Sequence, residues 1–381
     1  MKNNFNVNLR DSQYTPAESI PPERFDFSEY QSYEQELTER ISDFLESRTG
    51  LLVYRRMRAD GVYYDKAKDH GISLERQLGV LKKSLGFKAD IPNFLEPWYG
   101  IGYIASSFGN VDYVWKENQA PIVSPRFKSA KDLLYAETIP LEESRIGKNI
   151  LERIEYFLDK TKGKLPISFS DIQAPVNMLS YLIPMNNLCL EIIDDIESVR
   201  RAVTLVNNLQ ISFLKVQAEL IGDCLVKPGH GFPSSREFKG IGESSDNVIM
   251  FSQKHYTDVF QPEHEKIGNA FEGLAFHSCG NWAHHAQMIK SFHNLYMVDA
   301  AFSPLTDPDP NDPRSFYSIF KDTNIILNGR CVGDAEEVYP YFRQIVNPHM
   351  KTIATTYCQD EKDQEKLYNK LHVLHQGKSA R

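Results

Sequence analysis

The chain has 381 residues, of which 41% are hydrophobic and 25% charged, as in ordinary globular proteins with a buried core. The formal net charge of −8 argues against a nucleic-acid-binding surface, which needs clustered basic residues. No run of about 18 apolar residues is present, so the sequence predicts no membrane span.

Residues 1–30 contain no apolar signal-peptide core, which favours a cytoplasmic protein. The five cysteines are an odd and sparse set, so they do not indicate a disulfide framework, and we expect them to be reduced. Reduced thiols are available as metal ligands or nucleophiles.

Residues 1–50 are expected to form an N-terminal extension and a leading helix, and residues 51–381 a single domain. Within that domain, short apolar runs alternate with longer segments of helical periodicity. The runs predict eight strands, at residues 51–57, 91–97, 165–171, 238–244, 273–279, 295–301, 324–330 and 351–357. Apolar residues at three- and four-residue spacing predict helices over residues 198–225, 335–346 and 365–375.

Alternating strands and helices are typical of an α/β protein with a parallel sheet, and eight such units favour a closed (β/α)8 TIM barrel. An open doubly wound sheet is the alternative. No G-x-G-x-x-G follows an early strand, and the segment YGIGYIASSFG (99–109) has the wrong spacing and is expected in a loop, so a dinucleotide-binding fold is less favoured.

The segment FHSCGNWAHH (276–285) places His277 and Cys279 two residues apart at the end of the fifth expected strand. Side chains i and i+2 of a strand point the same way, so both ligand atoms would face the mouth of the barrel. Zinc uses imidazole and thiolate ligands, and a catalytic zinc keeps three protein ligands and one open position. Cys358 and Cys331 also follow expected strands, and either could supply the third ligand. Alternatively, these cysteines are small buried core residues.

Other polar residues also fall at expected strand ends. Glu96, Asp171 and Glu243 end the second, third and fourth strands, where a carboxylate can be a ligand, an orienting group or a general base. Asp171 could equally begin a turn. Arg330 could meet an anionic substrate or be an ordinary strand-end arginine.

Several segments together resemble the uroporphyrinogen decarboxylase superfamily. They are FLEPWYGIGYIASSFG, ISFSDIQAPVNMLSYLI, VIMFSQKHYTDVFQPEHEKI, LAFHSCGN and ILNGRCVGDAEEV, in the family's order over about residues 80–375. The resemblance implies a (β/α)8 barrel. One branch of the family decarboxylates porphyrinogens without metal; the other holds the methylcobalamin:coenzyme M methyltransferases, which bind zinc through His-x-Cys and a distant cysteine.

The sequence is more similar to the zinc branch, which implies that His277, Cys279 and Cys358 are the metal ligands. The implied activity is methyl transfer between a corrinoid (cobalamin), free or on a corrinoid protein, and a small thiol acceptor. We expect Glu96, Tyr181 and Glu243 to be catalytic and Asp171, Gln173 and Arg330 to bind substrate. Tyr181 fits both branches, and it is otherwise an ordinary core tyrosine of an amphipathic helix.

Two other functions stay open. A metal-independent lyase of the uroporphyrinogen decarboxylase type would need cationic residues, such as those in YRRMRADGVYY (54–64), to hold substrate carboxylates beside Glu96. A non-catalytic carrier of a corrinoid or metal is the third possibility. An ordered N-terminal arm would suit a homodimer.

Overall fold

The computed structural model describes residues 14–109, 111–117 and 119–377 and has an α/β architecture. Its centre is a six-stranded parallel sheet in the order β1-β8-β7-β6-β5-β4, and a separate antiparallel pair joins β2 and β3. The strands are β1 Gly50–Arg55, β2 Val114–Lys116, β3 Gln119–Ile122, β4 Ile241–Ser244, β5 Leu274–His277, β6 Leu295–Ala301, β7 Ile326–Cys331 and β8 Lys351–Thr356.

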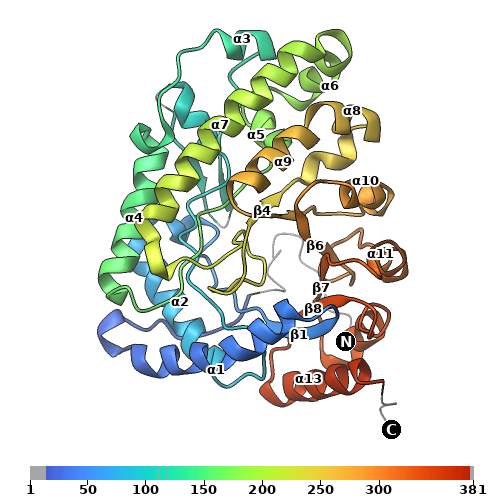
Figure 1. Ribbon diagram of the computed structural model, residues 1–381. Helices are drawn as coiled ribbons and strands as arrows, with labels where there is room; N and C mark the ends of the chain where they lie inside the picture. Colours follow the sequence, from blue (N-terminus) through green and yellow to red (C-terminus); the bar gives the residue numbers. More distant parts are fainter. Residues whose placement is uncertain (1–13, 110, 118, 378–381) are drawn as a thin grey trace.

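Helices surround the sheet, with α4, α7, α9, α10, α11 and α13 spread around its outside in Figure 1. The helices are α1 Phe27–Glu46, α2 His70–Ser84, α3 Ala130–Leu134, α4 Arg145–Thr161, α5 Pro175–Ser180, α6 Met185–Asp194, α7 Ile196–Ile221, α8 Gln253–Val259, α9 Gln261–Ala270, α10 Ala286–Lys290, α11 Pro313–Phe320, α12 Ala335–Phe342 and α13 Glu361–His375. The helices expected over 198–225, 335–346 and 365–375 correspond to α7, α12 and α13. No helix of the described residues is both long and apolar enough to cross a membrane.

The parallel sheet is buried on both faces, as expected where helices cover its outer side. Side chains on the inner face form one apolar cluster that includes Leu52, Ala275, Met297, Ile326 and Ile353. The intervening residues point outward into the larger core beneath the helices. Every strand residue is therefore assigned to a face by its parity.

Helix α1 closes one end of the inner cluster, because its Ile41 and Phe44 belong to that cluster. The Lys351 ammonium, at the start of β8, donates to the Leu45 carbonyl of α1 at 2.7 Å. Helix α1 therefore covers the amino ends of the strands.

The segments expected as strands two and three, residues 91–97 and 165–171, form isolated bridges in place of regular ladders. Leu95 pairs with Ile167, and Ile167 pairs with Leu225, all in parallel. Proline has no N–H to donate to a ladder, and these segments contain Pro92, Pro97 and Pro166. Regular strands therefore form a sheet that is not closed.

The chain between α7 and β4 is interrupted by an excursion at residues 227–240. Before the excursion Leu225 pairs with Ile167, and after it Ser244 pairs with Gln173, both in parallel. The chain therefore returns to the same neighbouring segment after the excursion. Lys227 and Ser235 exchange two backbone hydrogen bonds at 3.1 Å across its base. The excursion therefore holds residues 228–234 as an ordered turn beside the carboxyl ends of the strands.

Candidate metal centre

A cavity of about 510 Å³ opens at the carboxyl ends of the strands. Side chains with the same parity as the inner cluster reach it from successive strands: Arg56 after β1, His277 on β5, Asp299 on β6 and Arg330 on β7. In α/β folds this edge is where ligands bind. The polar residues that line the cavity thus lie on the same face of the sheet as the apolar inner cluster, closer to the carboxyl ends of the strands.

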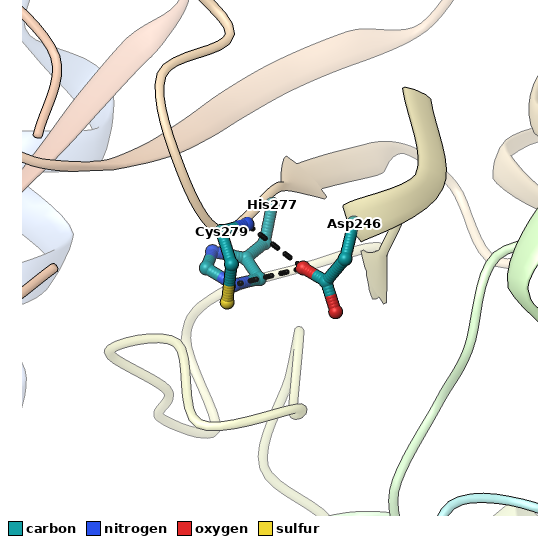
Figure 2. A group of neighbouring side chains, drawn as sticks. All are labelled: Asp246, His277 and Cys279. Atoms are coloured by element: carbon teal, nitrogen blue, oxygen red, sulfur yellow. Dashed lines mark hydrogen bonds and ion pairs between the residues drawn. The ribbon is translucent and has the colours of Figure 1, made fainter. Parts of the chain in front are cut away.

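Asp246, His277 and Cys279 bring three possible ligand atoms within 4.8 Å of one another (Figure 2). His277 Nε2 lies 3.4 Å from Cys279 Sγ and 3.7 Å from Asp246 Oδ1. A carboxylate, an imidazole and a thiol form a donor set that suits zinc. The expected i, i+2 pair is therefore joined by a carboxylate that the sequence did not single out.

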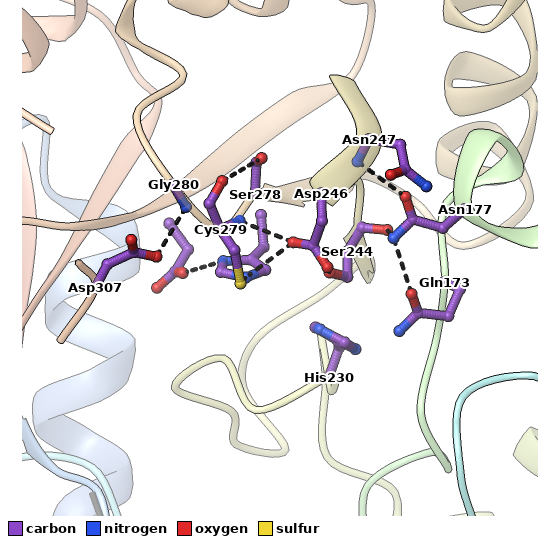
Figure 3. Close-up of polar contacts among 12 residues, drawn as sticks. Gln173, Asn177, His230, Ser244, Asp246, Asn247, Ser278, Cys279, Gly280 and Asp307 are labelled. Atoms are coloured by element: carbon purple, nitrogen blue, oxygen red, sulfur yellow. Dashed lines mark hydrogen bonds and ion pairs between the residues drawn. The ribbon is translucent and has the colours of Figure 1, made fainter. Parts of the chain in front are cut away.

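Neighbouring groups hold each of the three side chains in place (Figure 3). The Cys279 N–H donates to Asp246 Oδ1 at 2.8 Å, and the Ser244 hydroxyl donates to Asp246 Oδ2 at 3.0 Å. The Gly280 N–H donates to Asp307 at 2.8 Å, and Gly280 has a φ of 70°, a left-handed conformation that suits glycine. These contacts fix the loop after β5.

Asp299 orients His277. Its Oδ2 lies 2.5 Å from His277 Nδ1 and accepts from Arg330 Nε at 2.8 Å. Burial raises the pKa of Asp299, but the charges of Arg330 and His277 outweigh it and bring the pKa to about 2. With Nδ1 held by a carboxylate, Nε2 is the nitrogen that faces Cys279, which is the usual arrangement around protein zinc.

The Cys279 side chain is exposed to the cavity, although protein surrounds the cavity on most sides. Burial, with the nearby Asp246 carboxylate, raises the pKa of the Cys279 thiol. The thiol therefore stays protonated in the absence of a cation, and a bound divalent ion is the agent that would stabilise its thiolate.

The structure does not bring Cys358 or Cys331 to this group. Tyr357 precedes Cys358 and shares the inward parity of Ile353, whereas Thr356 faces outward and its hydroxyl donates to Gln364 of α13 at 2.8 Å. Cys358 has the parity of Thr356, is 1% exposed, and lies 3.8 Å from the Gly333 carbonyl. Cys331 has the outward parity of β7 and is fully buried.

Glu96 and Asp171 line the same cavity as His277. Glu96 accepts a short hydrogen bond from the Tyr63 phenol and lies 3.5 Å from Arg56. Asp171 accepts from Trp98 Nε1 at 3.0 Å. Both carboxylates are thus placed at the cavity, each with its own partners.

Tyr181 and Gln173 are linked to the cavity through Asp171. The Tyr181 phenol donates to Gln173 Oε1 at 3.1 Å, and the Gln173 amide makes a short hydrogen bond to Asp171. Burial raises the pKa of Tyr181, so its phenol stays protonated. Gln173 and Tyr181 therefore hold Asp171 in position through this chain of hydrogen bonds.

Glu243 points away from the cavity. It has the outward parity of β4, is fully buried, and lies 2.7 Å from His264 Nδ1, whose Nε2 lies 2.7 Å from the Tyr256 phenol. Desolvation raises the pKa of Glu243. Its contacts fix α9 against β4 and do not reach the metal group.

Two residues of this site were not predicted from the sequence. Asp246 follows β4 as the first residue of a 3-10 turn, Asp246–Met250, and lies beyond the strand end where a ligand was sought. His230 reaches the cavity from the excursion at 227–240, which no periodicity marks. The serine pair that precedes Asp246 is the one local hint, because Ser244 positions its carboxylate.

No family model matches this sequence, and no curated protein matches it. Its structure is similar to that of a methyltransferase from Methanosarcina mazei, with a TM-score of 0.63 and 12% sequence identity, over 88% of this chain and 98% of that one. At this identity the similarity establishes a shared fold.

Proposed function

We propose that this protein is a zinc-dependent methyltransferase that moves a methyl group between a corrinoid and a thiol acceptor. The observation that supports it most directly is the convergence of Asp246, His277 and Cys279 at the carboxyl ends of the strands. The fold is shared with a solved methyltransferase.

We infer that the molecule is a closed (β/α)8 barrel in which residues 91–97, 165–171 and 225–226 complete the ring. The isolated bridges that link Leu95, Ile167 and Leu225 support this inference. Ile91 and Val226 also join the same inner cluster as the side chains of the regular strands. An eight-stranded barrel has an interior that side chains fill in this way.

Zinc fits the donor set, and Asp246, His277 and Cys279 would hold it. When bound, zinc lowers the pKa of a thiol at its open position and so supplies a thiolate near neutral pH. In this proposal Asp299 keeps His277 oriented and holds Arg330 in place at the cavity.

The remaining cavity residues would bind and position the acceptor. Arg330 and Arg56 bring positive charge to the cavity, which suits a thiol that carries an anionic group. Asp171, supported by Gln173 and Tyr181, would accept a hydrogen bond from substrate, and Glu96 would orient Arg56. The open mouth would admit the methyl donor, free cobalamin or a corrinoid protein.

The test combines metal content with activity. Purified protein is expected to hold about one zinc per chain and to demethylate methylcobalamin when a small thiol is added. Cys279→Ser should lose both zinc and activity, whereas Cys358→Ser should keep its zinc, because Cys358 faces the opposite side of β8. Cys189→Ser, on α6, is the control for loss of a thiol as such. Wild-type protein that holds no zinc would contradict the proposal.

A metal-independent lyase is the second candidate, because Arg56 lies beside Glu96 in the cavity as that function requires. Such an enzyme would hold substrate carboxylates with its arginines. It predicts conversion of uroporphyrinogen to coproporphyrinogen by protein stripped of metal. Absence of that product, with zinc-dependent demethylation of methylcobalamin, removes this candidate.

A further inference from the structure

His230 lies beside the metal group and belongs to the excursion at 227–240. It lines the same cavity as His277 and Cys279, and its side chain is 14% exposed. Its ring centroid is 5.9 Å from that of His277. Figure 3 shows the imidazole next to the Asp246 carboxylate.

The backbone of the excursion holds His230 in an uncommon conformation. His230 has a φ of 49°, and its neighbours Gly229 and Gly231 have φ values of 81° and 67°. A residue other than glycine is uncommon in the left-handed region, and such strain persists mainly where a site uses it. The Ser234 hydroxyl accepts from the Gly229 N–H at 3.0 Å and donates to the Phe232 carbonyl at 2.9 Å, which braces the turn.

A carboxylate orients His230 just as one orients His277. Asp171 Oδ1 lies 3.3 Å from His230 Nδ1, and the Trp98 indole donates to the other oxygen of Asp171. The Ile172 N–H also approaches His230 Nδ1, at 3.5 Å, but the charged carboxylate is closer and keeps the proton on that nitrogen. Nε2 is then the nitrogen from which a metal ion would displace a proton, and an unprotonated Nε2 is the form in which histidine binds zinc.

We propose that His230 is a fourth ligand of the zinc held by Asp246, His277 and Cys279, bound when the cavity contains no thiol and displaced when a thiol enters. The inference rests on the proposed function. His230 is not one of the three residues whose ligand atoms lie within 4.8 Å of one another, so its ring has to approach them. A ligand that must approach is more easily exchanged than the three that are already together.

The structure supplies this ligand from the excursion in the fourth strand, where the family resemblance implied Cys358 from the eighth. Two imidazoles then face one ion. Each has a carboxylate beside its Nδ1 atom: Asp299 beside His277, and Asp171 beside His230. With four protein ligands on the zinc, no coordination position is left for water until the substrate thiol displaces His230.

The test uses zinc alone, followed by 2-mercaptoethanol as the probe thiol. X-ray absorption of wild-type protein should show two imidazoles and one sulfur on zinc; with the thiol, one imidazole should be replaced by a second sulfur. His230→Asn, in which asparagine tolerates the left-handed φ, should show one imidazole and lower zinc affinity by at least about tenfold. It should gain the sulfur without losing an imidazole.

Asp171→Asn is the second variant, because it removes the carboxylate charge beside His230 Nδ1 and keeps a side-chain oxygen that can accept from Trp98. It should weaken zinc binding less than His230→Asn does. The control is His349→Gln, an exposed histidine just before β8, which should match wild type. A melting temperature for each variant confirms that it folds.

The outcomes separate the two proposals. If His230→Asn matches wild type in imidazole count and affinity, the fourth-ligand proposal fails and the methyltransferase proposal stands. If the spectra behave as expected but methylcobalamin is not demethylated, the activity fails and the ligand assignment stands. Wild-type protein without zinc would overturn both.

Discussion

Asp299 accepts hydrogen bonds from Arg330 and Asn328 while it holds His277 Nδ1, so one buried carboxylate organises three side chains at the metal centre. Its pKa in the folded protein is about 2, against an ordinary value of 3.8. Because the folded value is the lower one, the charged carboxylate stabilises the fold above about pH 4. That contribution is lost as the pH falls through 2.

Asp299→Asn is therefore expected to lower the free energy of unfolding at pH 7 by about 2 kcal/mol, the equivalent of the shift in pKa. The difference from wild type should narrow as the pH falls from 4 towards 2. Urea unfolding of both proteins across this pH range measures it. A difference that is the same at pH 7 and pH 3 would show that the charge of Asp299 is not what stabilises the fold.

At the scale of the secondary-structure element, parity explains what the sequence could predict at this site. His277 and Cys279 were found because they are two residues apart, so they share a face whichever face it is. Strand β8, KTIATT, is buried on both sides, so its hydrophobicity does not alternate and the sequence does not show which residues point inward. The same ambiguity applies to Cys358 after β8, Glu243 on β4 and Cys331 on β7. All three side chains point outward, away from the cavity.

The excursion at 227–240 is a second element that the sequence did not reveal. Gly231, at a φ of 67°, lies against Arg56: a Cβ there would come within 2.2 Å of Arg56 Nη2. Arg56 is flexible and would move, which would disturb its contact with Glu96 at 3.5 Å. The glycine therefore matters for the cavity as well as for the turn.

Gly231→Ala is expected to cost about 1–2 kcal/mol for the left-handed backbone and, in addition, to weaken substrate binding through Arg56. Gly163→Ala is the matched control, since Gly163 has a φ of 58° but its Cβ would meet nothing nearer than Cys224 Sγ at 3.8 Å. Equal unfolding free energies with a raised KM only for Gly231→Ala would separate the two effects. An unchanged KM would mean that Arg56 does not contact substrate.

At the scale of the whole molecule, Asp90 links the two ends of the chain. Its buried carboxylate contacts Arg40 of α1 at 2.6 Å, and Tyr368 and His372 of α13 at 2.6 and 2.9 Å. It also accepts from the Val53 N–H of β1 at 2.8 Å. Sequence patterns predicted β1, β4 to β8 and the helices α1, α7, α12 and α13. Contacts between residues some 300 positions apart are set only by packing.

Asp90→Ala should destabilise the protein by about 3–5 kcal/mol, because it leaves several buried partners without an acceptor. Asp258→Ala, which breaks an exposed pair with Lys254 on α8, should leave the stability close to that of wild type. Midpoints of urea unfolding compare them. Similar losses for both variants would show that Asp90 does not connect the ends as described.

The pairing of β1 with β8 in register, from Gly50 opposite Lys351 to Arg55 opposite Thr356, has a consequence for biosynthesis. At about 5–20 residues per second, the ribosome delivers the partner of the first strand roughly 15–60 seconds after that strand has emerged. The nascent polypeptide must therefore hold an unsatisfied, apolar edge for that whole interval. We therefore expect the nascent chain to depend on chaperones during translation. We also expect chains that end before β8, because of a premature stop codon, not to fold.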